Sequence, residues 1–167
     1  MNEVKKKKFA LALDIQFFGK KKNALRGHFV QDYIPGTEEP TEVWLELAHQ
    51  ISNISDATAL ETEDTAWYDG DGTTEAEVIG IAEKWDVVGQ YDPTDEAQEL
   101  IASKKRKIGN ERKVFHKIVD ADGVKQWIGR ATLSENIVAG SGDASAYQEF
   151  ACSVQYDQIP KESEVTP

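Results

Sequence analysis

Cysteine and long hydrophobic runs are both scarce in this chain of 167 residues. Cys152 is the single cysteine, so no disulfide can form within the chain, which suits assembly in a reducing cytoplasm. No apolar run approaches the roughly 20 residues that a membrane-spanning helix needs. The sequence therefore excludes a disulfide-stapled fold, and we expect no membrane partner.

Lysine and arginine are absent from Gly27 to Glu83, although these 57 residues include 14 acidic ones. The 26 residues before them hold 8 basic residues and only Glu3 and Asp14 as acids. This pattern indicates that one face or loop set is kept negative in the folded protein. Such a face repels nucleic acid and other acidic surfaces unless something neutralises it. The basic N-terminal segment can do so, within the chain or from a neighbouring copy.

Residues 1–26 predict a basic N-terminal arm. A short apolar piece from Phe9 to Phe18 lies between two clusters of lysines, which are Lys5, Lys6, Lys7, Lys8, Lys20, Lys21 and Lys22. A charged cluster before an apolar run also resembles the start of a signal peptide. The apolar run stops at Asp14 after five residues, so a flexible or strand-forming arm is the better interpretation.

Length and composition predict one domain, since domains usually have about 100–200 residues. With 40% hydrophobic residues, the chain can bury a core without disulfides or metals. The net charge of −11 and the pI near 4.7 exclude a general nucleic-acid binder, which carries a basic stripe.

Residues 27–75 predict one strand between two loops. Two prolines and a glycine indicate a loop at residues 27–41. From Thr41 to Ile54, apolar residues alternate with polar ones at the strand period of two. Residues 55–75 are polar and acidic, with a turn at Asp69–Gly72, and we expect loop structure there apart from a possible short strand at Thr65–Tyr68.

A long or bent strand is expected over residues 76–91, where Gly80 or Gly89 permits a bulge. The clearest helix signal follows it. Asp92 is expected to cap this helix and Pro93 to occupy its first position. Ala97, Leu100 and Ile101 are expected to form its buried stripe. The basic residues from Lys104 to Lys107 are expected in its last turn.

The last third of the chain is the richest in strand signals. Arg112–Val119, Lys125–Ile137 and Tyr147–Tyr156 predict strands, with an Asp-Gly hairpin turn between the first two. The charged end, residues 160–167, is expected to be a flexible tail. Five or more strands at short spacing with one helix therefore predict a mainly β fold, a sandwich or barrel with one flanking α-helix.

Metal sites are not indicated by the histidines or by the acidic turn. The three histidines lie far apart without partners at ligand spacing, and His49 and His116 are expected to be ordinary strand residues. The run from Asp69 resembles a calcium loop. However, Thr74 replaces the required glycine and Gly80 the required glutamate. A solvated turn is the favoured interpretation, and weak calcium binding is the alternative.

Enzyme motifs are also missing from the sequence. It has no Gly-x-Ser-x-Gly, no P-loop and no dinucleotide fingerprint, and Cys152 is expected to be a buried apolar residue of a strand. We therefore expect no enzyme and no cofactor. The tryptophans could form a sugar platform, best at Trp67 beside Tyr68, but core or subunit contacts are the favoured interpretation.

Several local strings share one order and spacing with a known family. These strings are Trp44–Leu47, Ile51–Ile54, Tyr68–Gly72, Trp85–Tyr91, Asp95–Ile101 and Gly142–Phe150. From about Val43 to Pro160, this order resembles the tail tube protein (major tail protein) of long-tailed bacteriophages. The lysine-rich N-terminus departs from the family pattern.

The resemblance implies a structural virion protein that assembles in the bacterial host cytoplasm. Its subunits would form hexameric rings that stack into the tail tube. The partners would be other copies, the tape-measure protein, other tail proteins, and DNA only as cargo in the lumen. The resemblance also implies a fold of two packed antiparallel sheets with one flanking α-helix, a long loop and terminal arms. It implies no catalysis.

Two sets of charged residues acquire roles on this interpretation. An acidic lumen or loop repels phosphates, so DNA slides without sticking. The candidate lumen residues are Glu61, Glu63, Asp64, Asp69, Asp71, Glu75 and Glu77. The lysines of the arm are the candidate contacts between subunits.

The expected division of the chain is a basic arm at 1–26, a tail-tube β-sandwich domain at 27–159 and a flexible tail at 160–167. The alternative function is a β-sandwich module that binds carbohydrate or another protein. That alternative predicts an exposed Trp67 and Tyr68 in a monomer or small oligomer.

Overall fold

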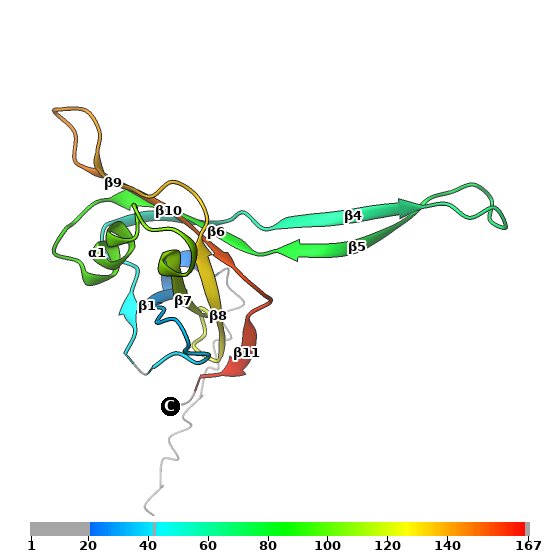
Figure 1. The fold of residues 1–167 in the computed structure, drawn as a ribbon, viewed down its shortest axis with the longest axis horizontal. Helices are drawn as coiled ribbons and strands as arrows, with labels where there is room; N and C mark the ends of the chain where they lie inside the picture. The colour runs from blue at the N-terminus through cyan, green and yellow to red at the C-terminus, as the bar shows by residue number, and fades with distance from the viewer. Residues whose placement is uncertain (1–20, 42, 166–167) are drawn as a thin grey trace, which may run out of the picture.

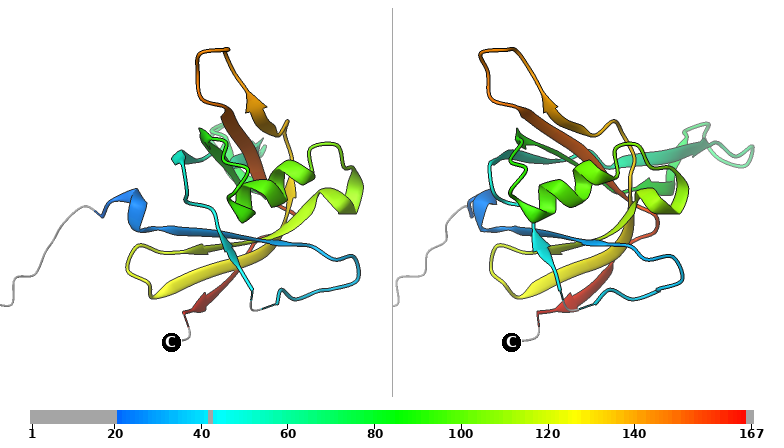
Figure 2. Two further views of the ribbon diagram at one scale, coloured as in Figure 1. Left: turned by 90° about the vertical axis from the view of Figure 1, so that its left-hand side faces the viewer. Right: turned by 60° about the vertical axis from the view of Figure 1, so that its left-hand side comes forward.

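The computed structural model describes residues 21–41 and 43–165, and nine of the eleven strands in this part of the chain form one curled antiparallel sheet (Figure 1). This sheet has nine strands in the order β2-β1-β7-β8-β10-β6-β3, with β9 on β10 and β11 on β8. Strands β4 and β5 form a separate two-stranded sheet. The predicted mainly β fold with one α-helix is confirmed. In place of two separate packed sheets, one sheet curls around the core (Figure 2).

The elements follow one another with short connections. They are η1 (Asn23–Leu25), β1 (Gly27–Asp32), β2 (Leu45–Glu46), β3 (Ile51–Asp56), β4 (Ala59–Thr65), β5 (Glu75–Ala82), β6 (Lys84–Gln90), α1 (Glu96–Ser103), η2 (Gly109–Arg112), β7 (Lys113–Val119), β8 (Lys125–Leu133), β9 (Val138–Ser141), β10 (Glu149–Tyr156) and β11 (Lys161–Glu164).

Alternating burial explains why the C-terminal strands form where the sequence predicts them. On β10, Phe150, Cys152 and Val154 are buried on the inner face of the sheet. Val114 and Ile118 on β7 do the same. Because side chains of a strand point alternately to its two faces, these residues all lie on the concave side of the sheet. There they form the core.

Helix α1 covers the core beside β1 and β2, but it begins later than the sequence suggests. Asp95, not Asp92, is the N-cap, and its Oδ1 accepts a hydrogen bond from the backbone N–H of Gln98 at 2.8 Å. Asp92 instead accepts one from the N–H of Thr94 at 2.9 Å and closes a turn. Ala97 and Ile101 are buried as expected.

Two expected loops are strands in the structure. Residues Gly27–Asp32 form β1, paired along its whole length with β7, because His28 and Val30 alternate with outward-facing residues. The long loop expected at 55–75 contains β4 and the start of β5. The strand expected over 41–54 is interrupted, because Gln50 has a φ of 57° and reverses the chain before β3.

The expected flexible tail is also corrected. Residues Lys161–Glu164 form β11, which pairs with Lys125–Ile128 of β8. Lys125 Nζ donates to Glu162 Oε1 at 2.6 Å, and Trp127 Nε1 donates to Glu162 Oε2 at 3.2 Å. Opposite charges across the strand pair therefore fix the end of the chain to the sheet.

The expected bulges are confirmed at both glycines. The register of β4 against β5 shifts opposite Gly80, and that of β3 against β6 shifts opposite Gly89. A Cβ at Gly89 would lie 2.3 Å from the carbonyl oxygen of Gln50. Only glycine therefore allows the chain to pass this close to β3.

Two histidines meet inside the core, which the sequence did not predict. His28 Nδ1 on β1 lies 3.4 Å from His116 Nε2 on β7, and both residues are at most 5% exposed. Burial, and to a lesser extent the nearby positive charge of Arg26, lowers the pKa of His28 to about 4. Burial, and to a lesser extent the electrostatic effect of His28, lowers the pKa of His116 to about 3. Both side chains are therefore neutral in the folded protein at pH 7.

Acid is expected to destabilise the fold through these two histidines. Their pKa values in the folded state lie below the unfolded value of 6.5, so below pH 6.5 the unfolded chain binds more protons. The free energy of unfolding should fall by about 1.4 kcal/mol per histidine for each pH unit between about 6.5 and 4. Urea titrations at pH 7.5, 6.5 and 5.5 measure this slope.

The control for this experiment is His49→Gln, because His49 is exposed and bonds only to Asp92 at 3.1 Å. His49→Gln should leave the pH dependence of the free energy of unfolding unchanged, whereas His116→Met should make it less steep. Equal unfolding free energies at pH 7.5 and 5.5 in the unmodified protein would contradict the account.

Candidate functional site

Strands β4 and β5 form a hairpin that extends away from the rest of the protein (Figure 1). It continues the pair β3 and β6, since only Ala57 and Thr58 separate β3 from β4, and only Glu83 separates β5 from β6. The backbone N–H of Ala57 donates to the carbonyl of Lys84 at 2.8 Å and joins the two halves of this ribbon. The inner half is packed in the sheet, and the outer half is exposed.

The hairpin has one apolar face. Leu60 of β4 lies opposite Ile81 of β5, and Thr62 lies opposite Val78. Directly paired residues share a face, so these side chains lie together. Leu60, Val78 and Ile81 are 59%, 51% and 55% exposed. A hairpin of two strands is at most marginally stable in water, and this one leaves its apolar face uncovered.

The other face of the hairpin is acidic. Glu61 lies opposite Gly80, and Glu63 lies directly opposite Glu77. Glu75 shares this face, opposite Thr65. Like charges in directly paired positions destabilise a hairpin, so this face weakens the hairpin rather than stabilising it. The arrangement therefore points to a role outside the folded monomer.

All seven candidate acidic residues lie on this hairpin, but they do not share one face. Asp64 pairs with Ala76, so it lies on the face of Leu60 and Thr62, opposite to Glu61 and Glu63. Asp69 and Asp71 lie in the turn at the tip. Asp71 Oδ1 accepts hydrogen bonds from the N–H and hydroxyl of Thr73, which hold the pKa of Asp71 below its usual range. This carboxylate is thus engaged in the turn itself, as in a solvated Asx-turn.

The tip also exposes two aromatic side chains. Trp67 is 66% exposed and Tyr68 is fully exposed. The other tryptophans have partners in the body, such as Trp44, whose ring lies 4.7 Å from Lys117 Nζ. Trp67 and Tyr68 thus add to the exposed apolar surface of the hairpin.

Of the candidate lysines, the structure describes Lys21 and Lys22, and the other five lie outside the described residues. Lys21 Nζ contacts Asp122 Oδ2 at 3.0 Å in the β7–β8 turn. The described part of the arm therefore binds an acid of its own domain and not the acidic hairpin.

The described residues contain no candidate metal site beside this surface. Within residues 21–41 and 43–165, no three His, Cys, Asp or Glu side chains are placed to hold a metal ion. In the same part of the chain, none of the helices has the length and apolar character to cross a membrane.

Sequence reasoning found the acids but missed the apolar face opposite them. Val78, Ile79 and Ile81 were expected as part of one long or bent strand over residues 76–91, which the structure divides at Glu83 into β5 and β6. Their partner strand β4 was taken as loop. In Ala59–Thr65, Leu60 and Thr62 alternate with Glu61 and Glu63, and Asp64 falls on the side of Leu60. The segment is therefore too polar to indicate a strand.

Replacing Glu63 by Lys should stabilise the hairpin, because a cross-strand repulsion with Glu77 becomes an attraction. Opposite-charge pairs contribute roughly 0.2–1 kcal/mol, so hydrogen exchange of the hairpin amides should slow by about 1.5- to 5-fold. Glu61→Lys changes the charge equally but faces Gly80 and should have a smaller effect. Equal slowing in both variants would contradict the pairing.

Comparison with known proteins finds similarity in structure. No protein-family model and no curated protein matches the sequence. A chain in the tail of an empty gene transfer agent particle with C6 symmetry has a TM-score of 0.64 at 9% identity, covering 87% of this chain and 99% of that chain. A chain in the virion of a native gene transfer agent particle has a TM-score of 0.53 at 10% identity, covering 81% and 95%.

Identities this low show the fold alone, and the fold agrees with the resemblance drawn from the order of the sequence strings. The chain therefore shares its fold with proteins of gene transfer agent tails and virions.

Proposed function

We propose that this chain is a structural virion protein that assembles with copies of itself into stacked, hexameric rings of a phage tail tube. The observation that carries the proposal is the β4–β5 hairpin, whose apolar face no other part of residues 21–41 and 43–165 covers. Another copy of the chain covers that face. The fold shared with a chain of a C6-symmetric tail supports this assignment.

Uncovered strand edges give a second reason for self-assembly. Strands β4 and β5 each pair only with the other, and β3 pairs only with β6, among the described strands. Such edges carry free backbone N–H and C=O groups that attract further strands. A closed ring satisfies these groups with a fixed number of copies and prevents open-ended aggregation.

The acidic face of the hairpin has a different role in this proposal. With the apolar face packed on a neighbour, Glu61, Glu63, Glu75 and Glu77 face the lumen. DNA then passes as non-specific cargo, repelled by the carboxylates. The tape-measure protein, which occupies the lumen before DNA, and other tail proteins are the further partners, and assembly takes place in the bacterial host cytoplasm.

The exposed Trp67 and Tyr68 favour one second candidate, a module that binds carbohydrate or another protein. In a tube, these side chains are buried in a contact between subunits. In a binding module, they stay exposed in a monomer, and their fluorescence changes when a glycan is added.

Assembly should depend on the apolar face of the hairpin. Val78→Lys places a charge in the proposed contact, and we expect the concentration needed for assembly to rise about tenfold or more. Sedimentation velocity with electron microscopy of the same samples measures this. Glu61→Gln, on the acidic face and with the same change of one charge, is the matched control and should assemble like the unmodified protein.

Unchanged assembly of Val78→Lys would remove the hairpin from the contact. A protein that stays monomeric at every concentration and whose tryptophan fluorescence responds to glycans would replace the tube proposal by the binding module.

The lumen assignment makes a separate prediction. Tubes in which Glu61, Glu63, Glu75 and Glu77 are all replaced by Lys should still form, because the apolar face is intact, but they should bind DNA with an affinity that falls steeply with salt. The control is tubes in which the same four glutamates are replaced by Gln, because they lose the repulsion of DNA without gaining positive charge. If the lysine tubes bind DNA no better than the glutamine tubes, these residues do not face the lumen.

A further inference from the structure

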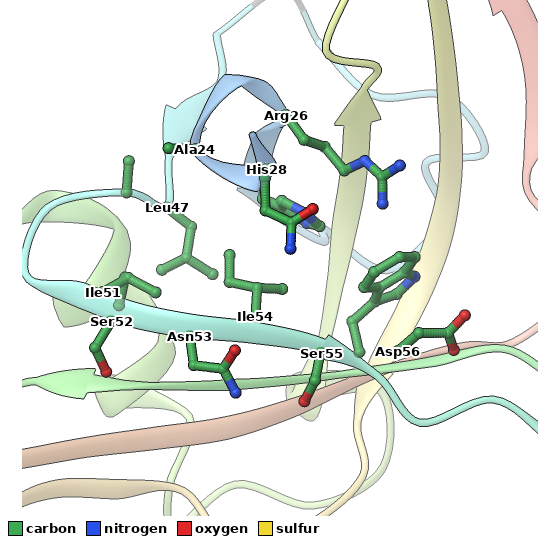
Figure 3. Close-up of a pocket in the computed structure, with 13 residues that line it drawn as sticks. Ala24, Arg26, His28, Leu47, Ile51, Ser52, Asn53, Ile54, Ser55 and Asp56 are labelled. Atoms are coloured by element: carbon green, nitrogen blue, oxygen red, sulfur yellow. The ribbon is translucent and has the colours of Figure 1, made fainter. Parts of the chain in front are cut away.

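The curled sheet stays open beside β3, and the opening is a groove of about 660 Å³. Segment η1 and the start of β1 lie across the groove from β3 (Figure 3). Ile51 and Ile54 point from β3 into the groove, whereas Ser52 and Ser55 point away from it. Leu47 and Trp85 complete an apolar floor, and Arg26, Asn53 and Asp56 add polar groups to the lining. The groove therefore accepts apolar side chains on its floor.

The free edge of β3 runs along this groove. Its six residues pair with β6 on one side, and no described strand pairs with the other side. An extended peptide that adds to such an edge gains backbone hydrogen bonds and can place every second side chain in the groove. The groove therefore fits a strand with alternating apolar residues.

We infer that residues 9–18 of a second copy of this chain occupy the groove as an added strand along β3. This inference rests on the proposed self-assembly and names one contact within it. The segment has the required alternation, since its odd positions are Phe9, Leu11, Leu13, Ile15 and Phe17. Ten extended residues span about 33 Å, more than the six residues of β3 need.

Charge complementarity supports the same occupant. The segment is flanked by lysines at 5–8 and 20–22, and β3 leads within three residues from Asp56 to the acidic hairpin at Ala59. Because the added segment is longer than β3, one of its two lysine clusters reaches the base of that hairpin, whether the segment runs parallel or antiparallel to β3. The two opposite charge clusters of the sequence then meet between copies.

The path of the described chain favours a second copy over the same chain. Asn23 and Ala24 line the groove, but by Lys21 the chain has reached Asp122 in the β7–β8 turn, which does not line it. To return to the groove, the same chain would have to reverse its direction within Gly19 and Lys20. A segment from a neighbour needs no such reversal.

Mixed disulfides between full-length chains test this contact. Cys152 does not interfere, because it is buried and burial raises the pKa of its thiol to about 12. One chain carries Leu13→Cys, and a second chain with a mass tag carries Ile54→Cys. After mild oxidation, we expect about tenfold more mixed dimer than with Ala12→Cys, whose side chain lies on the opposite face of the added strand.

Equal mixed dimer from Leu13→Cys and Ala12→Cys in samples that form tubes would overturn the groove contact and leave the tube proposal standing. A chain that carries both Leu13→Cys and Ile54→Cys and closes within itself at high dilution would overturn the second-copy assignment. Mixed dimer without any tubes would support the contact while contradicting the tube.

A second pair of variants measures the effect on assembly. The double variant Leu11→Lys and Leu13→Lys should raise the concentration needed for assembly about tenfold, since charges replace two groove contacts. The matched control, Ala10→Lys and Ala12→Lys, adds the same charge to the outward face and should assemble like the unmodified protein. Equal loss in both would overturn the inference.

Discussion

The structure depends on a ribbon of two strands that is packed at one end and bare at the other. Strands β3 and β6 belong to the curled sheet, and their continuations β4 and β5 leave it with an apolar face and an acidic face. A pair of strands cannot bury an apolar face by itself, and the glutamate pair Glu63 and Glu77 weakens it further. Both features become favourable when another copy covers the apolar face and the acids face an open channel.

The body of the protein holds this ribbon rigidly. Gly89 has no side chain, so β6 can lie close to the start of β3. Buried side chains such as Val87 and Phe150 anchor the inner half of the ribbon, β3 and β6, to the core. At the corner of the sheet, Asp157 binds Lys113 and Arg130, both at 2.8 Å. Burial alone would raise the pKa of Asp157, but the hydrogen bonds from Lys113, Thr132 and Arg130 hold it below its usual range. The exposed hairpin is thus carried on a fixed base.

For the half-buried strands of the last third of the chain, the sequence was sufficient, although β1, which shows the same alternation, was taken as loop. The alternation in β7 and β10 and the Asp-Gly turn after β7 predicted the C-terminal strands, because one side of each faces the core. The hairpin strand β4 was missed because neither of its faces is buried in the monomer, and burial is what creates the alternating pattern. The meeting of His28 and His116 depends on the register of β1 and β7, which the sequence does not display.

Electron microscopy of the unmodified full-length protein at increasing concentration, with reconstruction of the particles, tests the central claim most directly. We expect hollow tubes of uniform diameter built from stacked rings, with the apolar face of each β4–β5 hairpin packed on a neighbouring subunit. Tubes in which the hairpins project into solvent, or particles that remain monomeric at all concentrations, would contradict it.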